Sequence, residues 1–300
     1  MKVLVSGARG LIGTELSNQL NAAGHEVFGL SRSSARENFI RWNPETGELD
    51  SEKLNSLAID AVVHLAGENI ASGRWTEELK EKIRESRIKG TSLLVRTIKG
   101  LEVKPRVFVS ASAVGFYGDR EDQLLDETSD RGDGFLAELC DDWERACDGL
   151  KEDSIRVVNA RIGVVLSTKG GALSKMLPPF KLGLGGPIDS GKQYMSWITL
   201  KDVAGAIVYA IENDAISGPV NLVAPEPVTN AEFTRALGSA LGRPAFFPMP
   251  GFAAKMVFGE MAEELLLSST RVEPSVLNGS GFKFSSSNVD EALKHVLARR

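Results

Sequence analysis

The sequence predicts an α/β protein: a doubly wound parallel sheet with a smaller, mostly helical lobe towards the C-terminal end. Three observations lead to this prediction. Short apolar, β-branched runs alternate with amphipathic helical patterns along the first half of the chain, which implies right-handed βαβ crossovers. A glycine-rich turn joins the first strand to the first helix. Beyond residue 167 the chain is first rich in Gly and Pro and then mostly helical.

The elements of the sheet domain follow from the spacing of the apolar residues. Strands are expected at 2–6, 25–31, 61–67, 106–112, 155–167 and 218–225. Helices are expected at 14–24, 76–100, 134–146 and 201–213. On the helix at 134–146 the apolar stripe includes Phe135, Leu139 and Trp143, which we expect in the core. We assign residues 1–168 and 196–225 to this domain.

The remaining segments are expected to form a second structural unit. The Gly- and Pro-rich stretch at 169–192 predicts ordered loops with one short helix. Further helices are expected at 229–242 and 288–300, with an interruption at 246–251. We assign 169–195 and 226–300 to substrate-side loops and a C-terminal lobe. Such a lobe would face the carboxyl edge of the sheet, where ligands bind in open α/β proteins.

Composition and charge exclude several classes of function. The chain has 300 residues, of which 42% are apolar, and its net charge is −5, whereas nucleic-acid binding needs a basic face. No apolar run approaches the ~20 residues of a membrane span. The apolar run at the N-terminus is too short for a signal peptide and is better explained as a buried strand. We therefore expect a cytoplasmic protein that binds neither nucleic acid nor membrane.

The cysteines and histidines predict no metal site. Cys140 and Cys147 are expected on one helix, seven residues and about 10 Å apart, which is too far for a disulfide. We expect them to be buried thiols in a reducing compartment. His25, His64 and His295 have no Cys or His neighbours at ligand spacing.

The turn GARGLIG, residues 7–13, places Gly7, Gly10 and Gly13 between a strand and a helix. Gly7 would allow the tight turn, Gly10 the approach of the backbone to a pyrophosphate, and Gly13 close packing of helix and strand. The N–H groups at the helix start, where Leu11 and Ile12 lie, would hold the anion. The pattern predicts dinucleotide binding by a Rossmann-type fold.

The end of the second strand favours NADP(H) over NAD(H). An NAD site usually has an acidic residue there to hold the ribose hydroxyls, but this chain has Ser31, Arg32 and Ser33. Arg32 could pair with a 2′-phosphate, Ser31 could donate to it, and Arg9 in the glycine turn points the same way. The alternative is that Arg32 is a solvated loop cation.

Several longer motifs carry a resemblance to a known family. The glycine turn, HLAGENI at 64–70 and FVSASAVGFYG at 108–118 resemble an extended short-chain dehydrogenase/reductase. Three further motifs are similar to its atypical "epimerase family protein" subgroup, which has a C-terminal lobe; they are GENIASGRWTEELKEKIRESR (67–87), MLPPFKLGLGGPIDSGKQY (176–194) and SWITLKDVAGAI (196–207).

The resemblance implies a Rossmann sheet with NADP(H) and a substrate between the sheet edge and the lobe. It implies that Leu65, Ala66 and Gly67 pass beneath the cofactor and that Ser31 and Arg32 hold the adenosine phosphate. It also implies that Arg87 and Val165 lie along the cofactor. Without the resemblance, Leu65 and Val165 would be interpreted as core residues.

The resemblance also raises a problem, because the wider family carries a catalytic Tyr-x-x-x-Lys pair on the helix after the fifth strand. There the Tyr is the general acid and base, and the Lys lowers its pKa. In this chain the spacing gives either Phe135 and Leu139 or Leu136 and Cys140, which cannot transfer protons. The pair is absent elsewhere too, since the residues four positions after the three tyrosines are Glu121, Ile198 and Asn213.

Two hydroxyls remain as catalytic candidates. Ser112, at the end of the strand expected at 106–112, matches the family's hydroxyl that bonds a substrate carbonyl, and the alternative is strand-end capping. Tyr117 follows in the same loop as a candidate acid, and the alternative is a half-buried packing residue.

Candidate substrate contacts come from the loops over the site. Lys175, Lys181 and Lys192 could bind an anionic substrate or be solvated, and Glu68 and Asn69 could contact substrate or cap a turn. Twelve acidic residues between 119 and 148 are expected to form a solvated face.

We therefore predict an NADP(H)-binding oxidoreductase or epimerase-like protein that acts on a carbonyl or hydroxyl group of a small molecule. A nucleotide sugar is one candidate, and the substrate would be anionic if the lysines contact it. The alternative is a catalytically silent sensor or scaffold that holds NADP(H) without turnover. The missing Tyr and Lys favour the sensor, and the elaborate substrate-side loop favours the enzyme. The sequence predicts no oligomeric state.

Overall fold

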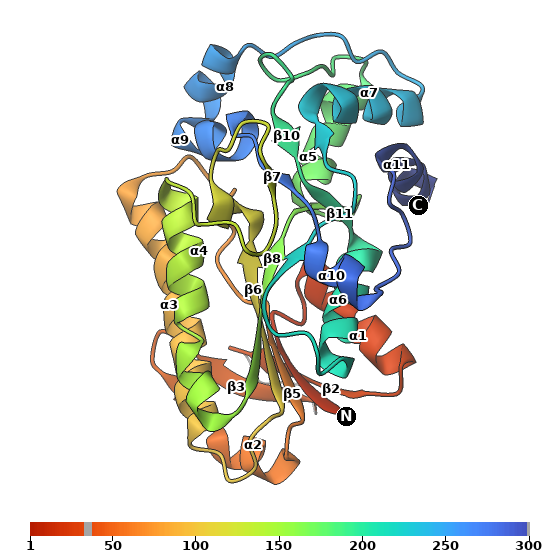
Figure 1. Cartoon of the computed structure of the whole chain (residues 1–300). Coiled ribbons are helices and arrows are strands. Elements are labelled where there is room, and N and C mark those ends of the chain that lie inside the picture. The colour runs from red at the N-terminus through yellow and green to blue at the C-terminus, as the bar shows by residue number, and fades with distance from the viewer. Residues whose placement is uncertain (33–37, 299–300) are drawn as a thin grey trace.

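The computed structural model describes residues 1–32 and 38–298 and centres on an eight-stranded sheet in the order β12-β8-β6-β5-β1-β2-β3-β4. All neighbouring strands in it are parallel except β3 and β4. The strands are β1 Lys2–Ser6, β2 Glu26–Ser31, β3 Phe39–Asn43, β4 Glu48–Leu49, β5 Ala61–His64, β6 Val107–Ala113, β8 Arg156–Ile162 and β12 Gly218–Leu222. The predicted doubly wound sheet is confirmed (Figure 1).

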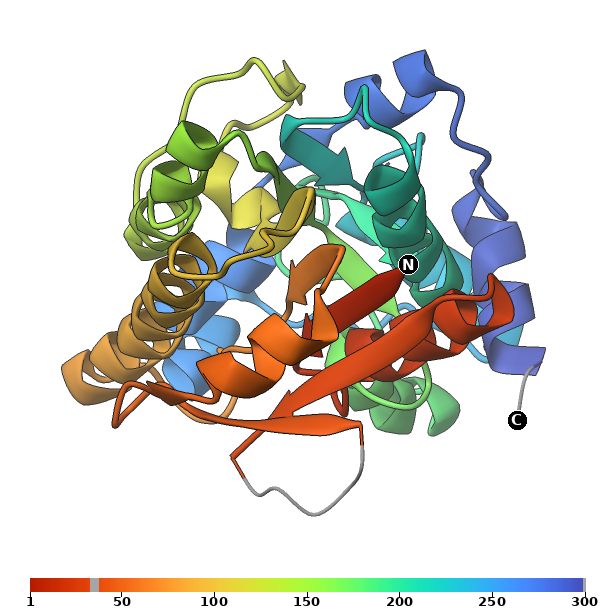
Figure 2. The same ribbon diagram turned by 90° about the horizontal axis from the view of Figure 1, so that it is seen from below.

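Helices cover both faces of this sheet. One face carries α1 (Leu11–Ala22) and α6 (Leu200–Glu212), and the other carries α2 (Ser51–Leu57), α3 (Glu77–Lys99) and α4 (Phe135–Arg145). The same division is visible from below (Figure 2). Each face has its own apolar core. The strand order reverses between β1 and β5, and the carboxyl ends of these two strands are therefore the expected ligand edge.

The C-terminal lobe lies above this edge in Figure 1. Three of its helices share one apolar core: α5 (Gly171–Lys181), α7 (Asn230–Leu241) and α11 (Val289–Ala298). Two others, α8 (Gly251–Phe258) and α9 (Glu260–Ala262), lie above α3 and α4. The helical lobe predicted from the sequence is thus present.

Among the described residues, the chain also forms three short strand pairs and one further α-helix, and the last of these pairs joins a segment of the sheet domain to the lobe. The pairs are β9 (Val164–Leu166) with β11 (Trp197–Thr199), β10 (Tyr194–Met195) with β13 (Val228–Thr229), and β7 (Leu124–Leu125) with β14 (Arg271–Val272). Helix α10 (Ser275–Ser280) contacts β12, so this late segment packs on the sheet although we assigned it to the lobe.

Some element boundaries differ from the prediction for physical reasons. The strand expected at 155–167 is interrupted at Gly163, where a Cβ atom would lie 2.7 Å from the Ser196 carbonyl oxygen. Beyond this glycine, β9 leaves the main sheet and pairs with β11. The strand expected at 61–67 ends at His64, because Leu65 and Ala66 turn into the loop at the sheet edge.

The buried residues of helix α4 differ in part from the predicted ones. Leu139 and Trp143 are buried as expected, but Phe135 is only half-buried, and its neighbour Leu136 occupies the core position. The expectation that both cysteines lie on this helix is wrong, because α4 ends at Arg145 and Cys147 follows it. Both cysteines are nonetheless buried free thiols, and burial raises their pKa values to about 11 and about 12.

Candidate cofactor site

The glycine-rich turn between β1 and α1 leaves no room for side chains. Gly7 has φ +70°, and a Cβ atom added to it would lie 3.0 Å from the carbonyl carbon of Leu65. A Cβ atom on Gly13 would lie 2.1 Å from the Gly7 carbonyl oxygen, so only glycine lets α1 pack this close to the turn. Gly10 is the N-cap of α1 and, within the described chain, provides no side-chain cap. The first N–H groups of α1 are therefore not taken by a cap and suit an anion.

Arg9 in this turn is held against the neighbouring strands. Its guanidinium carbon lies 4.5 Å from the centre of the Phe39 ring on β3. That ring occupies the space left free by Gly29 on β2, where a Cβ atom would lie 2.4 Å from it. Arg32, just beyond β2, is exposed, and Ser31 at its end is half-buried. Ser33, which we expected in the same group, lies outside the described residues.

Arg87 of α3 contacts the loop after β5, beside the segment expected beneath the cofactor. Its Nη1 donates to the carbonyl oxygens of Glu68 and Ile83, both at 3.1 Å. Its guanidinium lies 5.0 Å from the centre of the Trp143 ring and 3.3 Å from the position of a Cβ atom on Gly67. Burial lowers the pKa of this guanidinium, but arginine remains charged at physiological pH.

The start of α1 meets the beginning of α5. The Leu11 side chain lies 3.6 Å from the position of a Cβ atom on Gly171, and the Val165 carbonyl oxygen lies at the same distance. Ile12 and Val165 are half-buried against the core under this point. The fold thus brings together three of the residues expected to bind the cofactor.

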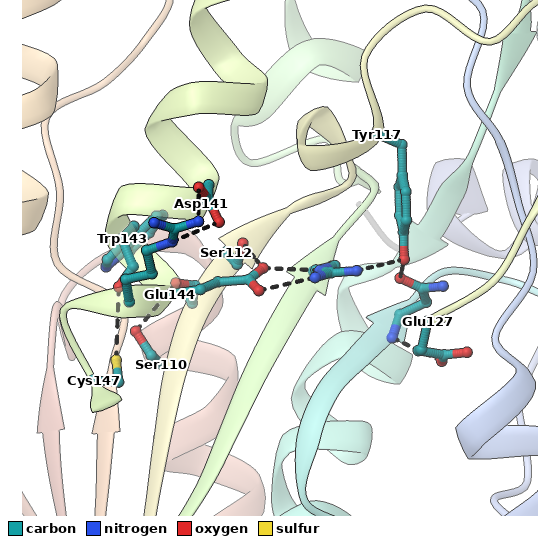
Figure 3. A network of polar contacts seen from close by, with 12 residues as sticks. Ser110, Ser112, Tyr117, Glu127, Asp141, Trp143, Glu144 and Cys147 are labelled. Carbon is teal, nitrogen blue, oxygen red and sulfur yellow. Dashed lines mark hydrogen bonds and ion pairs between the residues drawn. The ribbon is translucent and has the colours of Figure 1, made fainter. Parts of the chain in front are cut away.

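The hydroxyls of Ser112 and Tyr117 belong to a chain of buried polar contacts (Figure 3). Ser112 donates to Glu144 Oε1 at 2.7 Å, and Glu144 forms a two-point ion pair with Arg161 at 2.8 and 2.9 Å. Arg161 donates to the Tyr117 hydroxyl at 3.0 Å, and that hydroxyl donates to Asn221 Oδ1 at 2.7 Å. The contacts connect β6, α4, β8 and β12.

These contacts favour a packing role for Tyr117 over the role of an acid. Its side chain has no exposed surface, and burial raises the pKa of its phenol to about 12. Ser112 is 3% exposed and commits its only proton to Glu144. Neither hydroxyl has a proton left for a substrate in this arrangement.

The expectation of a wholly solvated acidic face is wrong at two positions. Glu144 has an 11% exposed side chain because it pairs with the buried Arg161. Glu127 is 8% exposed, and its Oε1 accepts from the backbone N–H groups of Asn221 and Val276. Burial raises the pKa of Glu127. Sequence pattern alone gave no sign that these two carboxylates face inwards.

Comparison with known proteins supplies the family. Residues 3–223 match the NAD dependent epimerase/dehydratase family, and residues 249–296 match a domain of unknown function, DUF1731. The chain belongs to the NAD dependent epimerase/dehydratase family. An epimerase family protein of Mycobacterium tuberculosis is 45% identical over 298 residues, which are 99% of this chain and 98% of that protein.

Two solved structures have similar chains. The human epimerase family protein SDR39U1, solved with NADPH, has a TM-score of 0.91 and 38% identity over all of both chains. A nucleoside-diphosphate sugar epimerase from Corynebacterium glutamicum has a TM-score of 0.81 and 37% identity, over 99% of this chain and 58% of that longer one. The predicted family and the NAD(P)-binding type of fold are confirmed.

Within this epimerase/dehydratase fold, the C-terminal lobe caps the helix that lacks the Tyr and Lys pair. The two carboxylate oxygens of Glu264 accept from the N–H groups of Phe135 and Leu136, each at 2.8 Å. Gly134 precedes the helix with φ +100°, and a Cβ atom on it would lie 2.9 Å from Glu264. Glu264 carries no local signal of this role in the sequence, because its partners are 129 and 128 residues away.

The substrate-side candidates divide between structural contacts and exposed charges. Asn69 Oδ1 accepts a hydrogen bond from the Ala71 N–H, so Asn69 caps a turn in this structure. Lys175 donates to the Ala71 carbonyl at 3.0 Å and so joins α5 to the loop after β5. Glu68 Oε2 forms an ion pair with Lys82 Nζ at 3.8 Å. Lys181 and Lys192 are exposed, and no structural observation assigns a ligand to them.

In residues 1–32 and 38–298, no group of three or more His, Cys, Asp or Glu side chains is placed to hold a metal ion. None of the helices described here combines the length and apolar character needed to cross a bilayer.

Proposed function

We propose that this protein binds NADP(H) at the turn between β1 and α1 and transfers hydride to or from a carbonyl or hydroxyl group of a small molecule. The observation that carries the proposal is the turn itself. Gly7 and Gly13 have no space for a Cβ atom, and Gly10 opens α1 without a side-chain cap of its own among the described residues. A pyrophosphate fits such a turn because the backbone can approach it and the helix start donates N–H groups.

Charge at the end of β2 supports NADP(H) over NAD(H). The extra phosphate of NADP carries about −1.5 to −2 charges near neutral pH and needs cationic partners. Arg9 is held against Phe39, and Arg32 is exposed just beyond the strand. The adjacent position is Ser31, where NAD-specific proteins usually present a carboxylate. The NADPH in the human relative's structure agrees with this assignment.

At the end of the site expected to hold the nicotinamide, the chain supplies residues that can position the ring, but α4 supplies no tyrosine to act as an acid. When bound, NADP(H) supplies or accepts a hydride at its nicotinamide ring. Leu65 and Ala66 would form the floor, and Arg87 would present a fixed positive charge beside Gly67. Since α4 carries neither Tyr nor Lys, any proton that accompanies the hydride would be exchanged with another group at the site, water included. A nucleotide sugar remains one candidate substrate, in line with the Corynebacterium protein's name.

A second candidate function is a sensor or scaffold that holds NADP(H) without turnover. It is favoured by one observation: the hydroxyls of Ser112 and Tyr117 both donate within the protein. A protein that only binds a cofactor has no need of a free acid. The contact from Lys175 across to Ala71 favours the enzyme instead, because it joins the lobe to the sheet domain over the expected ligand edge.

Calorimetric titration with NADPH and NADH tests the cofactor assignment. A charge-assisted Arg contact is worth about 1.5–3 kcal/mol, so Arg32→Ala should weaken NADPH binding about ten- to hundredfold and barely change NADH binding. Arg145→Ala is the matched control, because this arginine is exposed at the far end of α4. Equal affinity of the wild type for both cofactors, or equal weakening of both by Arg32→Ala, would contradict the assignment.

A substrate screen separates the enzyme from the sensor. The protein is loaded with NADPH, and the absorbance of the reduced nicotinamide is followed after addition of carbonyl compounds, including nucleotide sugars with a keto group. Loss of the reduced band at a rate that scales with protein concentration supports turnover. A stable band with every compound, together with tight NADPH binding, would favour the sensor.

A further inference from the structure

The hydroxyl of Ser6, at the end of β1, makes three polar contacts. It lies 3.1 Å from the backbone nitrogen of Leu65, 3.2 Å from that of Ala66 and 2.6 Å from Nδ1 of His64. Ser6 and His64 are partners in the parallel register of β1 and β5, and neither has exposed surface. The contact is therefore made inside the sheet, directly below the ligand edge.

Counting protons fixes the direction of each hydrogen bond. A hydroxyl has one proton and two acceptor lone pairs. The N–H groups of Leu65 and Ala66 can only donate, so both approach the acceptor side of the Ser6 hydroxyl, and the Leu65 N–H is shared with the Ser6 carbonyl oxygen at 3.3 Å. The proton of Ser6 must then go to Nδ1 of His64, which accepts it only if Nδ1 itself carries no proton. The ring proton of His64 therefore lies on Nε2.

The surroundings of His64 favour a neutral ring. Burial, with a smaller contribution from the Arg87 charge, lowers the pKa of His64 to about 3. Nε2 is buried and meets no hydrogen-bond partner among the residues described. The His64 ring lies in a cage of aromatic rings, T-shaped to those of Trp42 and Trp143 with 6.0 and 6.5 Å between centres. The hydrogen bond between Nδ1 and Ser6 is therefore the one through which His64 can position its neighbours.

We propose that Ser6 and His64 form a proton-ordered clamp that positions the Leu65–Ala66 backbone, the floor of the cofactor site. This inference rests on the proposed cofactor site. The floor lies against the glycine turn, because a Cβ atom on Gly7 would be 3.0 Å from the Leu65 carbonyl carbon and 3.1 Å from the Ala66 nitrogen. His64 thus acts through Ser6 as a positioning residue and touches no cofactor.

Two substitutions of His64 separate the clamp from simple packing. His64→Phe keeps an aromatic ring in the cage but removes the acceptor for the Ser6 proton. His64→Asn leaves a void in the cage but keeps an acceptor oxygen close to the position of Nδ1. We expect His64→Phe to weaken NADPH binding about three- to tenfold, the equivalent of one misdirected hydrogen bond. We expect His64→Asn to bind NADPH within about twofold of the wild type in spite of a lower melting temperature.

A serine pair supplies the matched control. Ser6→Ala removes the clamp and should weaken NADPH binding as much as His64→Phe. Ser110→Ala removes an equally buried hydroxyl from β6, the strand next to β5, where it donates to the Ala111 carbonyl and makes no contact with the Leu65 and Ala66 backbone among the hydrogen bonds described, and should leave binding unchanged. The clamp is overturned if Ser6→Ala binds NADPH as well as the wild type, or if His64→Asn binds as poorly as His64→Phe.

Nuclear magnetic resonance tests the clamp without any cofactor. The nitrogen shifts of His64 in the wild type should show a proton on Nε2 and none on Nδ1, and a proton on Nδ1 would overturn the proposal. Hydrogen exchange at the Leu65 and Ala66 amides should accelerate in Ser6→Ala and remain slow in Ser110→Ala. If the wild type fails to bind NADPH while these signatures hold, the proposed function fails and the proton-ordered contact itself stands.

Discussion

Glu264 accepts a hydrogen bond from the backbone N–H of Phe135 at 2.8 Å, and its other carboxylate oxygen accepts from the next N–H at the same distance. The acceptor belongs to the lobe matched by the domain of unknown function, and the donors open α4 of the sheet domain. Gly134, the N-cap of α4, provides no side-chain cap, so the lobe satisfies the start of this helix. In the wider family this helix carries the catalytic pair, and here a lobe carboxylate sets its position.

Glu264→Ala should destabilise the protein and loosen the lobe. A charge-assisted hydrogen bond contributes about 1.5–3 kcal/mol, so we expect a loss of about that size in the free energy of unfolding, measured by urea denaturation. Glu263→Ala is the matched control, because the Glu263 side chain is 54% exposed and forms a surface ion pair with Lys255. Such a surface pair is worth about 0–1 kcal/mol. Equal losses in the two variants would contradict a capping role for Glu264.

Glu144→Gln should be among the most destabilising polar substitutions. It leaves the Arg161 charge buried without its carboxylate, and breaking a buried ion pair typically costs about 3–5 kcal/mol. Glu138→Gln on the exposed side of the same helix should cost about 0–1 kcal/mol. Chemical denaturation of both variants makes the comparison. A loss below about 1 kcal/mol in Glu144→Gln would show that the pair is solvated in solution.

Tyr117→Phe should lower stability without changing hydride transfer. The substitution removes a hydrogen bond to Asn221 and one from Arg161, and leaving these groups without a partner costs about 1–3 kcal/mol. If the substrate screen finds turnover, the kcat of this variant should equal that of the wild type. A loss of kcat by more than tenfold at unchanged stability would restore Tyr117 as an acid.

Stability should fall with acid because of His64. Its pKa is about 3 in the folded protein and 6.5 in a free histidine, so between these pH values the unfolded chain binds the extra proton. The stabilising effect of the neutral ring is present above pH 6.5 and is lost as the pH falls towards 3, by roughly 1.4 kcal/mol for each pH unit. Denaturation from pH 7 to pH 4 should therefore show a steeper decline in the wild type than in His64→Asn. Parallel curves would mean that His64 titrates normally in the fold.

Much of the fold is predictable because its signals are local. Strands such as β1 and β5 are short, mostly apolar runs, and the helix expected at 76–100 forms as Glu77–Lys99 with Thr76 as its N-cap. The glycine turn is predictable for the same reason, because its three glycines and the first helix are adjacent. No element was predicted between 32 and 60, where β3, β4 and α2 are short and only a few side chains, such as Trp42, are buried.

The remaining features depend on residues that are far apart in the sequence. Nothing near Glu144 indicates that Arg161 will meet it from a neighbouring strand, so an acidic helix face looks solvated in the sequence. Phe135 and Leu136 are adjacent apolar residues at the start of α4, and the spacing alone did not show that Leu136 would be the buried one. The clamp on the cofactor floor is hidden similarly, since Ser6 and His64 are 58 residues apart.

The return of the chain from the lobe to the sheet affects how the protein is made. Leu277 on α10 is fully buried in the same core as the strands, and the Phe282 ring lies 5.4 Å from that of Tyr209 on α6. While the ribosome is still adding these residues, the face of β12 that they cover stays open to water and to chaperones. The first 223 residues, though they form a family unit by sequence, therefore cannot complete their core as an independent nascent domain.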